Sequence, residues 1–298
     1  MPKMVYFCEN IIRKPSSERS GGLGGIVLEE QTALIAGEGS LPVEIASRLT
    51  DRGRPPVVYS IRENVGALSR YALDVVNITK PDFGFTIKDM RKHGVKNVIM
   101  AGTVSKTLIF KPSLFDLTTQ RFLAGLLFRD DHSLLGAIVD FLEKEGFHVL
   151  SYRDIVPDLL AKSGHIAGRR PTKEELDDAE YGFSICKAVV PLSFGQTVIT
   201  HKRSVVAVEA MEGTDATLLR AGSLCKGGVV AKMMRLDQDE RYDIPTVGPE
   251  TLYHMAQAKL TCLALHAGWT LIVEPEKFRK AAEEKNISVI GVEVCRSL

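Results

Sequence analysis

Hydrophobic and polar positions follow two alternating patterns along the first half of the chain. Short, nearly continuous apolar runs predict buried strands, and the longer segments between them carry apolar residues at helical spacing, which predicts covering helices. Pro42 stands at the first position of one expected helix, and Gly53 and Gly146 stand where two helices end. Strands are expected at 33–36, 56–60, 74–78, 96–102 and 147–151, and helices at 42–53, 85–94 and 130–146. Residues 32–162 are therefore predicted to form a Rossmann-like domain with a parallel sheet.

The pattern changes in the second half of the chain. Glycine, proline and charged residues dominate 161–178, so a domain boundary is expected between residues 162 and 163. After Gly195 apolar residues alternate singly, which predicts a hairpin. Strands are expected at 197–200 and 205–210, which form this hairpin, and at 227–234, 269–275 and 288–294; helices are expected at 216–221, 249–268 and 276–285. Residues 163–298 are therefore predicted to form a second, mixed α/β domain that carries the catalytic residues.

Composition excludes several kinds of protein. The 298 residues are enough for two apolar cores, and residues 1–31 are expected to form a mobile extension. With 38 Lys and Arg against 37 Asp and Glu, the net charge of +1 gives no long-range attraction for nucleic acid. The five cysteines form no CxxC pair, which argues against disulfides and a zinc site. No apolar run reaches the roughly 20 residues of a membrane span, and no signal peptide is recognisable, so a cytoplasmic protein is expected.

Residues 207–251 combine carboxylates, cations and glycines in segments expected to be connections rather than solvated helix faces. The carboxylates are Glu212, Asp215, Asp237, Asp239 and Asp243; the glycines are Gly213, Gly227, Gly228 and Gly248; the cations are Lys226, Lys232, Arg235 and Arg241. Carboxylates hold metal ions or activate water, cations neutralise phosphate oxygens, and glycines let backbone N–H groups approach a ligand. The combination points to a phosphate site.

The segment from Asp243 to Thr251 places a carboxylate beside a predicted helix start. Pro249 favours the first helical turn, so the free backbone N–H groups of that turn face the loop that carries Asp243 and Thr246. Such a loop can hold a phosphate and activate the water that attacks it. The alternative is that Thr246 or Gly248 is an ordinary helix cap and Asp243 a solvated loop residue.

Glu212, Thr214 and Asp215 surround a glycine just before a short predicted helix. Neighbouring carboxylates repel each other unless a cation or a proton lies between them, which favours a ligand site. Alternatively, Thr214 or Asp215 caps the helix, which contributes about 1 kcal/mol. A cap needs only one of these side chains, so the retention of all three favours the site.

The turn after the first strand, GEGSLP at 37–42, has part of a dinucleotide-binding fingerprint. Pro42 occupies the position of the third glycine, and Arg62 rather than an acidic residue follows the next strand, so the full fingerprint is absent. The turn either simply leads into a helix, or it brings a helix N-terminus, through Gly37 and Gly39, close to a phosphate or a uracil-type ring.

Eight segments in register connect these features: LIAGEGSLP (34–42), MAGTV (100–104), DDHSLL (130–135), EGFHV (145–149), FGQTV (194–198), AVEAMEGTDATLLRAG (207–222), GGVVAK (227–232) and QDERYDIPTVGPET (238–251). Together they resemble the UDP-2,3-diacylglucosamine pyrophosphatase family of lipid A synthesis, of the LpxI type. The resemblance implies two domains with a Rossmann-like N-terminal half. It also implies hydrolysis of UDP-2,3-diacylglucosamine to UMP and 2,3-diacylglucosamine 1-phosphate (lipid X), with a divalent metal, expected to be Mg²⁺. The family's catalytic aspartate falls on Asp243 in DIPTVG.

Pyrophosphate chemistry and the resemblance together give each candidate residue a role. The charges of a pyrophosphate repel an incoming oxygen, so cations that neutralise its oxygens and a base that takes the proton of water lower the barrier. Catalytic roles are expected for Asp243 and Asp215, and a metal site for Glu212, Asp215 and Asp243. Substrate contacts are expected from Gly37, Gly39, Ser40, Thr103, Asp130, Asp131, Gln196, Thr214, Lys232, Arg241, Thr246 and Gly248. His132 and His254 have no partner at metal-ligand spacing and are expected to be structural or solvent-facing.

The connection 106–128 is rich in leucine and phenylalanine and is longer than a compact α/β unit needs. It either contacts acyl chains, as a trough or a lid, or forms an amphipathic core or dimer helix. A lipid substrate makes peripheral contact with the inner membrane an expectation, and a homodimer is expected as well.

Two other classes of protein remain open. One is a non-catalytic nucleotide-sugar-binding or sensing protein, and the other is a dinucleotide-dependent oxidoreductase built on the same N-terminal fold. Metal-dependent release of UMP would favour the hydrolase, tight binding without turnover the sensor, and a change in nicotinamide absorbance the oxidoreductase.

Overall fold

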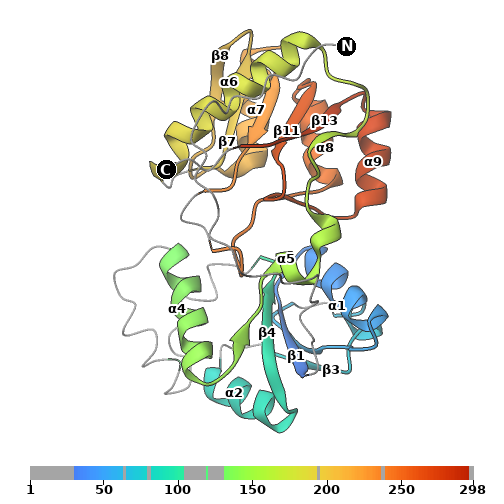
Figure 1. Ribbon diagram of the computed structural model, residues 1–298, viewed down its shortest axis with the longest axis vertical. Coiled ribbons are helices and arrows are strands. Elements are labelled where there is room, and N and C mark those ends of the chain that lie inside the picture. The colour runs from blue at the N-terminus through green and yellow to red at the C-terminus, as the bar shows by residue number, and fades with distance from the viewer. Residues whose placement is uncertain are drawn as a thin grey trace, which may run out of the picture.

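The computed structural model describes residues 30–62, 65–78, 82–103, 119, 131–192, 195–235 and 239–294. Its two large sheets are built from separate halves of the chain. Figure 1 shows the blue-to-green N-terminal half below the yellow-to-red C-terminal half. The prediction of an α/β fold with two domains is confirmed.

The first sheet has five parallel strands in the order β3-β2-β1-β4-β5. The strands are β1 (Gln31–Ala36), β2 (Val57–Ser60), β3 (Asp74–Asn77), β4 (Val95–Ala101) and β5 (His148–Val149), with helices α1 (Leu41–Asp51), α2 (Phe83–Lys92), α4 (Asp131–Lys144) and α5 (Tyr152–Ile155). The strand order reverses between β1 and β4. Open α/β sheets bind ligands beyond the carboxyl ends of the strands at such a switch point.

Local signals in the sequence explain the elements of the first domain. α1 begins with a proline in its first turn, and Gly53 follows it with a φ of 74°. Asp82 caps α2 by accepting a hydrogen bond from the backbone N–H of Phe85 at 2.7 Å. The central strands are apolar on both faces, as Leu34 on β1 illustrates by being fully buried, because helices cover the sheet on both sides.

The second sheet has six strands in the order β6-β13-β11-β9-β7-β8. They are β6 (Gly164–Ala167), β7 (Thr197–His201), β8 (Ser204–Val208), β9 (Val229–Lys232), β11 (Cys262–His266) and β13 (Ser288–Val292). β9, β11 and β13 are parallel, whereas β6, β7 and β8 pair with antiparallel neighbours. The predicted hairpin is β7–β8, and its turn residues Lys202 and Arg203 have φ values of 51° and 55°.

Four helices flank the second sheet, and a small sheet lies apart from it. The helices are α6 (Lys173–Val189), α7 (Gly213–Leu224), α8 (Pro249–Gln257) and α9 (Pro275–Glu284). The small sheet pairs β10 (Thr246–Val247) with β12 (Leu271–Ile272) in parallel. Short 3-10 helices cover Leu68–Arg70, Pro157–Leu159 and Val190–Leu192.

The helix expected over 249–268 is shorter than predicted. It begins at Pro249 as expected, but α8 ends at Gln257, and residues 262–266 form β11 instead. A run of five apolar or buried residues fits either a helix or a buried strand by its pattern alone. Pairing of this run with β9 on one side and β13 on the other makes it a strand.

The helix expected over 216–221 is longer than predicted. α7 runs from Gly213 to Leu224, so Gly222 lies inside the helix and does not end it. A Cβ atom at Gly222 would lie 2.5 Å from the backbone oxygen of Ala258. The glycine therefore serves the close approach of α7 to the end of α8.

Apolar and polar contacts join the two domains. Met234 and Ile244 of the second half pack in one core cluster with Leu150 and Tyr152 of the first. Arg241 also donates from Nη1 to Glu143 Oε1 at 2.7 Å, across the same junction. Met234, Arg241 and Ile244 therefore lie where the domains meet.

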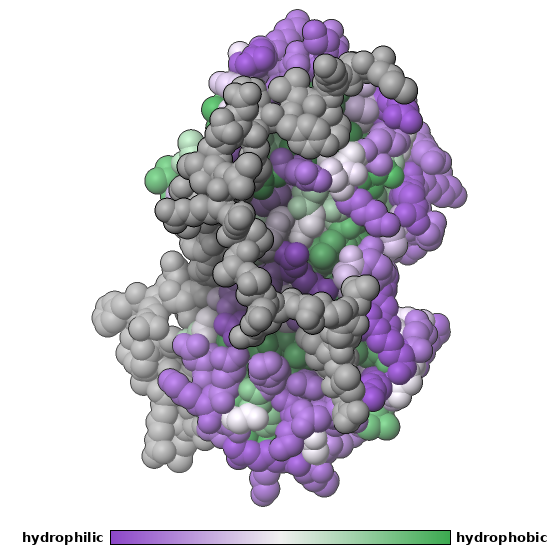
Figure 2. Space-filling model, viewed as in Figure 1, coloured by the Kyte–Doolittle hydropathy of each residue, from purple (hydrophilic) through white to green (hydrophobic). Residues whose placement is uncertain are grey.

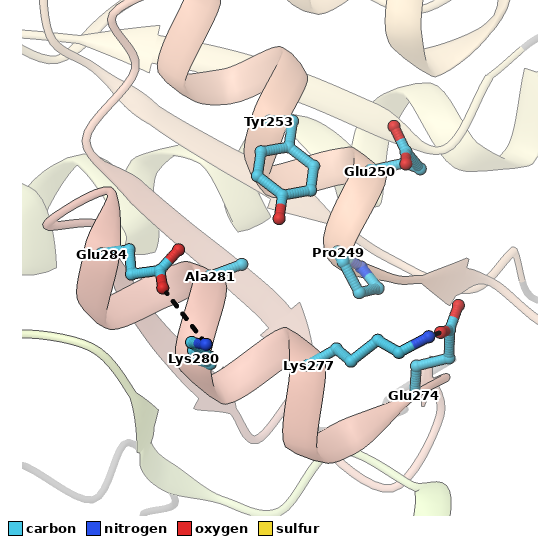
Figure 3. Close-up of a pocket in the computed structure, with 8 residues that line it drawn as sticks. All are labelled: Pro249, Glu250, Tyr253, Glu274, Lys277, Lys280, Ala281 and Glu284. Carbon is cyan, nitrogen blue, oxygen red and sulfur yellow. Dashed lines mark hydrogen bonds and ion pairs between the residues drawn. The ribbon is translucent and has the colours of Figure 1, made fainter.

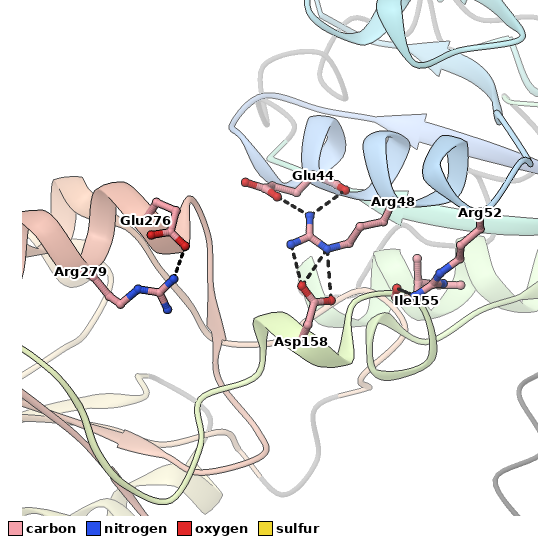
Figure 4. Close-up of polar contacts among 7 residues, drawn as sticks. All are labelled: Glu44, Arg48, Arg52, Ile155, Asp158, Glu276 and Arg279. Carbon is pink, nitrogen blue, oxygen red and sulfur yellow. Dashed lines mark hydrogen bonds and ion pairs between the residues drawn. The ribbon is translucent and has the colours of Figure 1, made fainter.

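The chain that leaves the first domain is anchored on α1. Arg48 donates to both carboxylate oxygens of Asp158 over 2.7–3.1 Å and also contacts Glu44, and Arg52 donates to the carbonyl of Ile155 at 2.9 Å (Figure 4). The hydrogen bonds from Arg48 lower the pKa of Asp158 although partial burial opposes the shift. The crossing to the second domain therefore starts from a tethered segment.

The surface seen in Figure 2 is mainly hydrophilic over the described parts of both domains. No helix within the described ranges has the length and apolar character needed to cross a membrane. The connection 106–128, for which acyl-chain contact is an expectation, lies outside the described residues apart from Thr119.

Candidate active site

Lys232 is a buried cation at the end of a central strand. It is the last residue of β9, is only 5% exposed, and pairs in register with Thr197 on β7. Its Nζ donates to Thr214 Oγ1 at 2.9 Å and to Thr197 Oγ1 at 3.4 Å. These contacts with neutral hydroxyl groups use two of the three hydrogens of the ammonium. A buried ammonium with neutral partners is well suited to receive an anion.

Three carboxylates from different parts of the chain influence the charge state of this ammonium. Burial lowers the pKa of Lys232, and the charges of Glu209, Asp215 and Asp243 oppose that shift. Glu209 follows β8, Asp215 lies on α7, and Asp243 precedes β10. The fold therefore brings together the two acidic segments that the sequence singled out. We call Lys232, Thr214, Glu209, Asp215 and Asp243 the Lys232 cluster.

Asp243 lies at the junction of the two domains. Arg235 donates from Nη2 to Asp243 Oδ2 at 3.2 Å. Burial, and after it the charge of Asp243, raises the pKa of Tyr152, whose hydroxyl donates to the carbonyl of Met100 on β4. Asp243 is therefore close to the carboxyl end of β4, beside the switch point of the first sheet.

Asp215 has a histidine neighbour that the sequence did not indicate. His254 Nδ1 on α8 lies 3.0 Å from Asp215 Oδ1, which is an ion-pair distance when the imidazole is protonated, although the alignment does not make a hydrogen bond. The Asp215 side chain is 62% exposed. His254 thus faces a candidate catalytic carboxylate.

The three predicted metal ligands are not gathered into one centre. Glu212 contacts Arg220 and accepts a hydrogen bond from Thr217 Oγ1 at 3.2 Å. Across the part of the chain that the structure describes, no group of three or more His, Cys, Asp or Glu side chains could hold a metal ion. Asp215 and Asp243 remain near Lys232, whereas Glu212 is engaged by its own helix.

The helix-cap alternatives fit the structure only in part. Gly248 is indeed the N-cap of α8, and the exposed Thr246 donates to the carbonyl of Ile244 at 3.1 Å. Asp243, however, is paired with Arg235 rather than being a free loop residue.

The capping alternative fails for α7. Its N-cap is Glu212, which makes no side-chain capping bond, and Thr214 and Asp215 lie inside the first turn. Thr214 donates its hydroxyl hydrogen to Glu209 Oε1 at 2.8 Å instead. The Thr214 side chain is therefore committed to the Lys232 cluster.

The predicted nucleotide contacts gather at the switch point of the first sheet. Glu38 and Thr103 exchange two backbone hydrogen bonds of 2.7 and 3.0 Å. A Cβ at Gly37 would lie 2.5 Å from the oxygen of Thr103, so glycine is needed for this approach. Gly39 has a φ of 102°, and Ser40 is the N-cap of α1 without a side-chain capping bond. The turn therefore has a structural reason for its glycines, and its contact with a nucleotide stays a prediction.

Arg241 is held by carboxylates on both sides of the junction. Its Nε donates to the two oxygens of Asp239 at 2.9 and 3.0 Å, and its Nη1 reaches Glu143 on α4. These hydrogen bonds outweigh partial burial and raise the pKa of Arg241 further. The guanidinium joins the domains, and in this arrangement it is not presented to a phosphate.

The other predicted site residues contribute less to this geometry. The backbone carbonyl of Gln196 accepts a hydrogen bond from the N–H of Met233 at 2.9 Å, one residue beyond β9. Asp131 is the first residue of α4, and its side chain lies outside the described part. Asp130 lies outside the described residues altogether.

Glu209 and His254 are the site neighbours that sequence reasoning missed. Glu209 ends an alternating pattern that predicts an ordinary strand residue, and only its position in the segment VEAMEGTD distinguishes it. His254 meets Asp215 through the packing of α8 against α7, which no spacing along the chain reveals.

A hollow of about 480 Å³ lies between α8 and α9, away from Lys232. Its lysines already have partners, because Lys277 contacts Glu274 and Lys280 Nζ lies 3.7 Å from Glu284 Oε1 (Figure 3). The lining carries three glutamates against two lysines, both of them paired, so the hollow is unfavourable for a phosphate and we place the candidate chemistry at the Lys232 cluster.

The chain matches two family descriptions over most of its length. Residues 31–159 match the LpxI N-terminal domain, and residues 162–290 match the LpxI C-terminal domain. The chain is also 32% identical over 273 residues to the UDP-2,3-diacylglucosamine pyrophosphatase LpxI of Caulobacter vibrioides, which spans 87% of this chain and 96% of that protein. The resemblance carried by the eight sequence segments is therefore confirmed: this chain belongs to the LpxI family.

Proposed function

We propose that this chain hydrolyses the pyrophosphate bond of UDP-2,3-diacylglucosamine, releasing UMP and 2,3-diacylglucosamine 1-phosphate in lipid A biosynthesis. Membership of the LpxI family and the name of the Caulobacter vibrioides relative support the substrate. The observation that carries the chemistry is the Lys232 cluster, in which a buried ammonium and two candidate catalytic carboxylates converge beside the domain junction.

Each residue of the cluster has a task in this reaction. Lys232 neutralises charge on the phosphate oxygens, and it acts strongly because it is shielded from water. Asp243 takes the proton from the attacking water, and Arg235 orients the Asp243 carboxylate through the bond to Oδ2. Asp215 lies on the first turn of α7, where it adds a second acceptor close to the same ammonium.

A divalent metal, expected to be Mg²⁺, fits this site as a partner that arrives with the substrate. Mg²⁺ is commonly bound by one or two carboxylates together with substrate phosphates, rather than by a protein cage. Asp215 and Asp243 are the residues that would hold it, whereas Glu212 is occupied by Arg220. When bound, the ion would neutralise phosphate oxygens and so complement Lys232.

Other regions of the chain are proposed to bind the remaining parts of the substrate. The nucleotide is assigned to Gly37, Gly39, Ser40 and Thr103 at the switch point, where α/β sheets bind such ligands. Acyl-chain contact by 106–128, peripheral association with the inner membrane, a cytoplasmic location and a homodimer stay predictions.

Release of UMP from UDP-2,3-diacylglucosamine tests the function directly. Purified full-length protein is expected to release UMP and lipid X in equal amounts with Mg²⁺, and a chelator is expected to abolish the release. Tight binding without turnover would instead indicate a sensor, and a change in nicotinamide absorbance would instead indicate an oxidoreductase. Turnover that is insensitive to chelation would contradict the metal dependence but still support hydrolysis.

A further inference from the structure

Glu209 is a buried carboxylate that accepts a hydrogen bond through one of its two oxygens. It is 8% exposed and directly follows β8, where its backbone N–H donates to the carbonyl of Thr197 at 2.9 Å. A Cβ at Gly195 would lie 2.0 Å from the Glu209 backbone oxygen, so the backbone at Gly195 packs directly against Glu209. Glu209 Oε1 accepts from Thr214, whereas the buried Oε2 has no hydrogen-bond partner among the described residues. The backbone of Glu209 is therefore tightly packed, and within the described ranges only one oxygen of its carboxylate is hydrogen-bonded.

The hydrogen bonds run in one direction from the cation to this carboxylate. Lys232 Nζ donates to Thr214 Oγ1, and Thr214 Oγ1 donates to Glu209 Oε1. A hydroxyl group has a single hydrogen. Because Glu209 takes that hydrogen, the lone pairs of Thr214 are free to face Lys232. Glu209 thus determines which way the hydroxyl points, and through it where the ammonium is held.

Stability alone gives no reason for this arrangement. A buried carboxylate and a buried ammonium each lose their hydration, and replacing such groups by apolar residues of similar size is often neutral or stabilising. An oxygen that is buried without a donor adds a further cost. Groups that reduce stability without completing their hydrogen bonds are typical of functional sites.

We propose that Glu209 is a positioning residue of the pyrophosphatase reaction, which acts through Thr214 to keep the Lys232 ammonium charged and directed at the substrate phosphates. This inference rests on the proposed function. Glu209 itself is not assigned a contact with the reacting atoms. Its contribution is the orientation of Thr214 and the negative charge that balances a cation in a water-poor site.

The charge of Glu209 has a predictable effect on the pH dependence. Among the described residues, the charges of Glu209, Asp215 and Asp243 raise the pKa of the Lys232 ammonium, and burial lowers it against all three. Removing the Glu209 charge lowers that pKa further. The protonated form of Lys232 is then lost at a lower pH, so activity falls earlier as the pH rises.

The test compares Glu209→Gln and Thr214→Val, alone and combined, in UMP release over a range of pH. Glu209→Gln is expected to lower kcat/KM about 10- to 100-fold near neutral pH. It is also expected to move the alkaline limb of the pH–activity profile, where activity falls as the pH rises, to lower pH by roughly one unit. Thr214→Val breaks the same chain, so the double variant is expected to be no worse than the more severe single variant. An unmoved alkaline limb, or effects that simply multiply in the double variant, would overturn the proposal.

Glu175→Gln is a matched control for this experiment. Glu175 is also 8% exposed and lies in the same domain, but its contacts are with Arg169, Thr172 and Thr261. The control is expected to leave the alkaline limb in place, and a shift of the same size in both variants would show a general effect of losing a buried charge. Wild-type protein that releases no UMP would refute the proposed function, whereas active wild type with an unaffected Glu209→Gln would refute only the positioning role.

Discussion

Two carboxylates in the C-terminal domain are equally buried but differ in how many hydrogen bonds they accept. Glu175 and Glu209 are both 8% exposed. Glu175 Oε1 accepts from Thr261 Oγ1 at 2.7 Å, and Oε2 accepts from the N–H of Thr172 at 2.9 Å and from Arg169 at 2.8 Å. Glu209 accepts one hydrogen bond, from Thr214, and its Oε2 is buried without a partner among the described residues.

The cations beside these carboxylates differ in the same way. Arg169 makes five hydrogen bonds, to Glu175 and to backbone carbonyls, which matches the five N–H donors of a guanidinium. Lys232 donates to two hydroxyl groups, and it makes no direct contact with a carboxylate of the described part of the chain. We call Arg169, Glu175, Thr172 and Thr261 the Arg169 cluster. All five donors of Arg169 are used, which is typical of a structural contact. The Lys232 ammonium makes two hydrogen bonds to described residues, so one of its three hydrogens is left for the proposed ligand.

Asp243→Asn tests the Lys232 cluster most severely. The amide keeps the shape of the side chain but cannot take a proton from water, so kcat is expected to fall about 10³-fold, which corresponds to about 4 kcal/mol. The thermal midpoint is expected to change little, because Arg235 can still donate to the amide oxygen. Steady-state release of UMP and a thermal melt measure the two effects.

Asp239→Asn provides the control for Asp243→Asn. Asp239 lies four positions earlier and is bound by Arg241 through both oxygens, so it belongs to a contact that joins the domains. This variant is expected to lose stability and to keep most of its turnover per folded molecule. Wild-type turnover in Asp243→Asn, or equal losses in both variants, would remove the role of the base from Asp243.

Glu175→Gln tests the Arg169 cluster and is expected to have the opposite result. Breaking the pair with Arg169 is expected to cost about 2 kcal/mol of unfolding free energy, below the roughly 3–5 kcal/mol of fully buried pairs, because the Arg169 side chain is 27% exposed. Turnover per folded molecule is expected to stay within a factor of about two of the wild-type value. Chemical denaturation and UMP release measure both quantities, and lost turnover in a stable variant would end the contrast between the clusters.

The same variant has a defined pH dependence. Burial works to raise the pKa of Glu175, but the hydrogen bonds from Arg169, Thr172 and Thr261 outweigh it, so the pKa is lowered. A lowered folded pKa gives stability that is fully present above the unfolded value of about 4.3 and is lost as the pH falls through the folded value. The stability difference between wild type and Glu175→Gln is therefore expected to be constant near neutral pH and to shrink in acid below about pH 4. A difference that instead grows in acid would contradict this assignment.

The contrast also explains how far the sequence alone could lead. Apolar runs, a proline at a helix start and glycines at helix ends predicted the strands of the first sheet, because these signals are local. The sequence pattern wrongly predicts a helix at 262–266, since only pairing with two neighbouring strands makes this segment β11. Asp243 and Lys232 could be singled out because they lie in a segment unusually rich in carboxylates, cations and glycines.

The residues that lie next to Asp243 and Lys232 in three dimensions could not be predicted from the sequence. Glu209 has the sequence pattern of a strand end, and its importance comes from the buried contact with Thr214. Glu212 and Asp215 are close in sequence, yet Glu212 turns to Arg220 on the same helix while Asp215 lies near Lys232 and His254. Residue types suggested a chemistry for the site, and packing shows which of these side chains lie near one another.

His254 gives the smallest expected effect and the finest test of the Lys232 cluster. Its Nδ1 lies 3.0 Å from Asp215 Oδ1, so it can hold the exposed carboxylate toward the site without touching the substrate. His254→Leu is expected to lower kcat/KM about 10-fold, equivalent to about 1.4 kcal/mol, whereas His254→Asn, which keeps a donor near the same place, is expected to recover most of the loss. The two variants are expected to have similar thermal midpoints. Equal activity in His254→Leu, His254→Asn and wild type would make Asp215 a surface carboxylate and would confine the chemistry to Lys232 and Asp243.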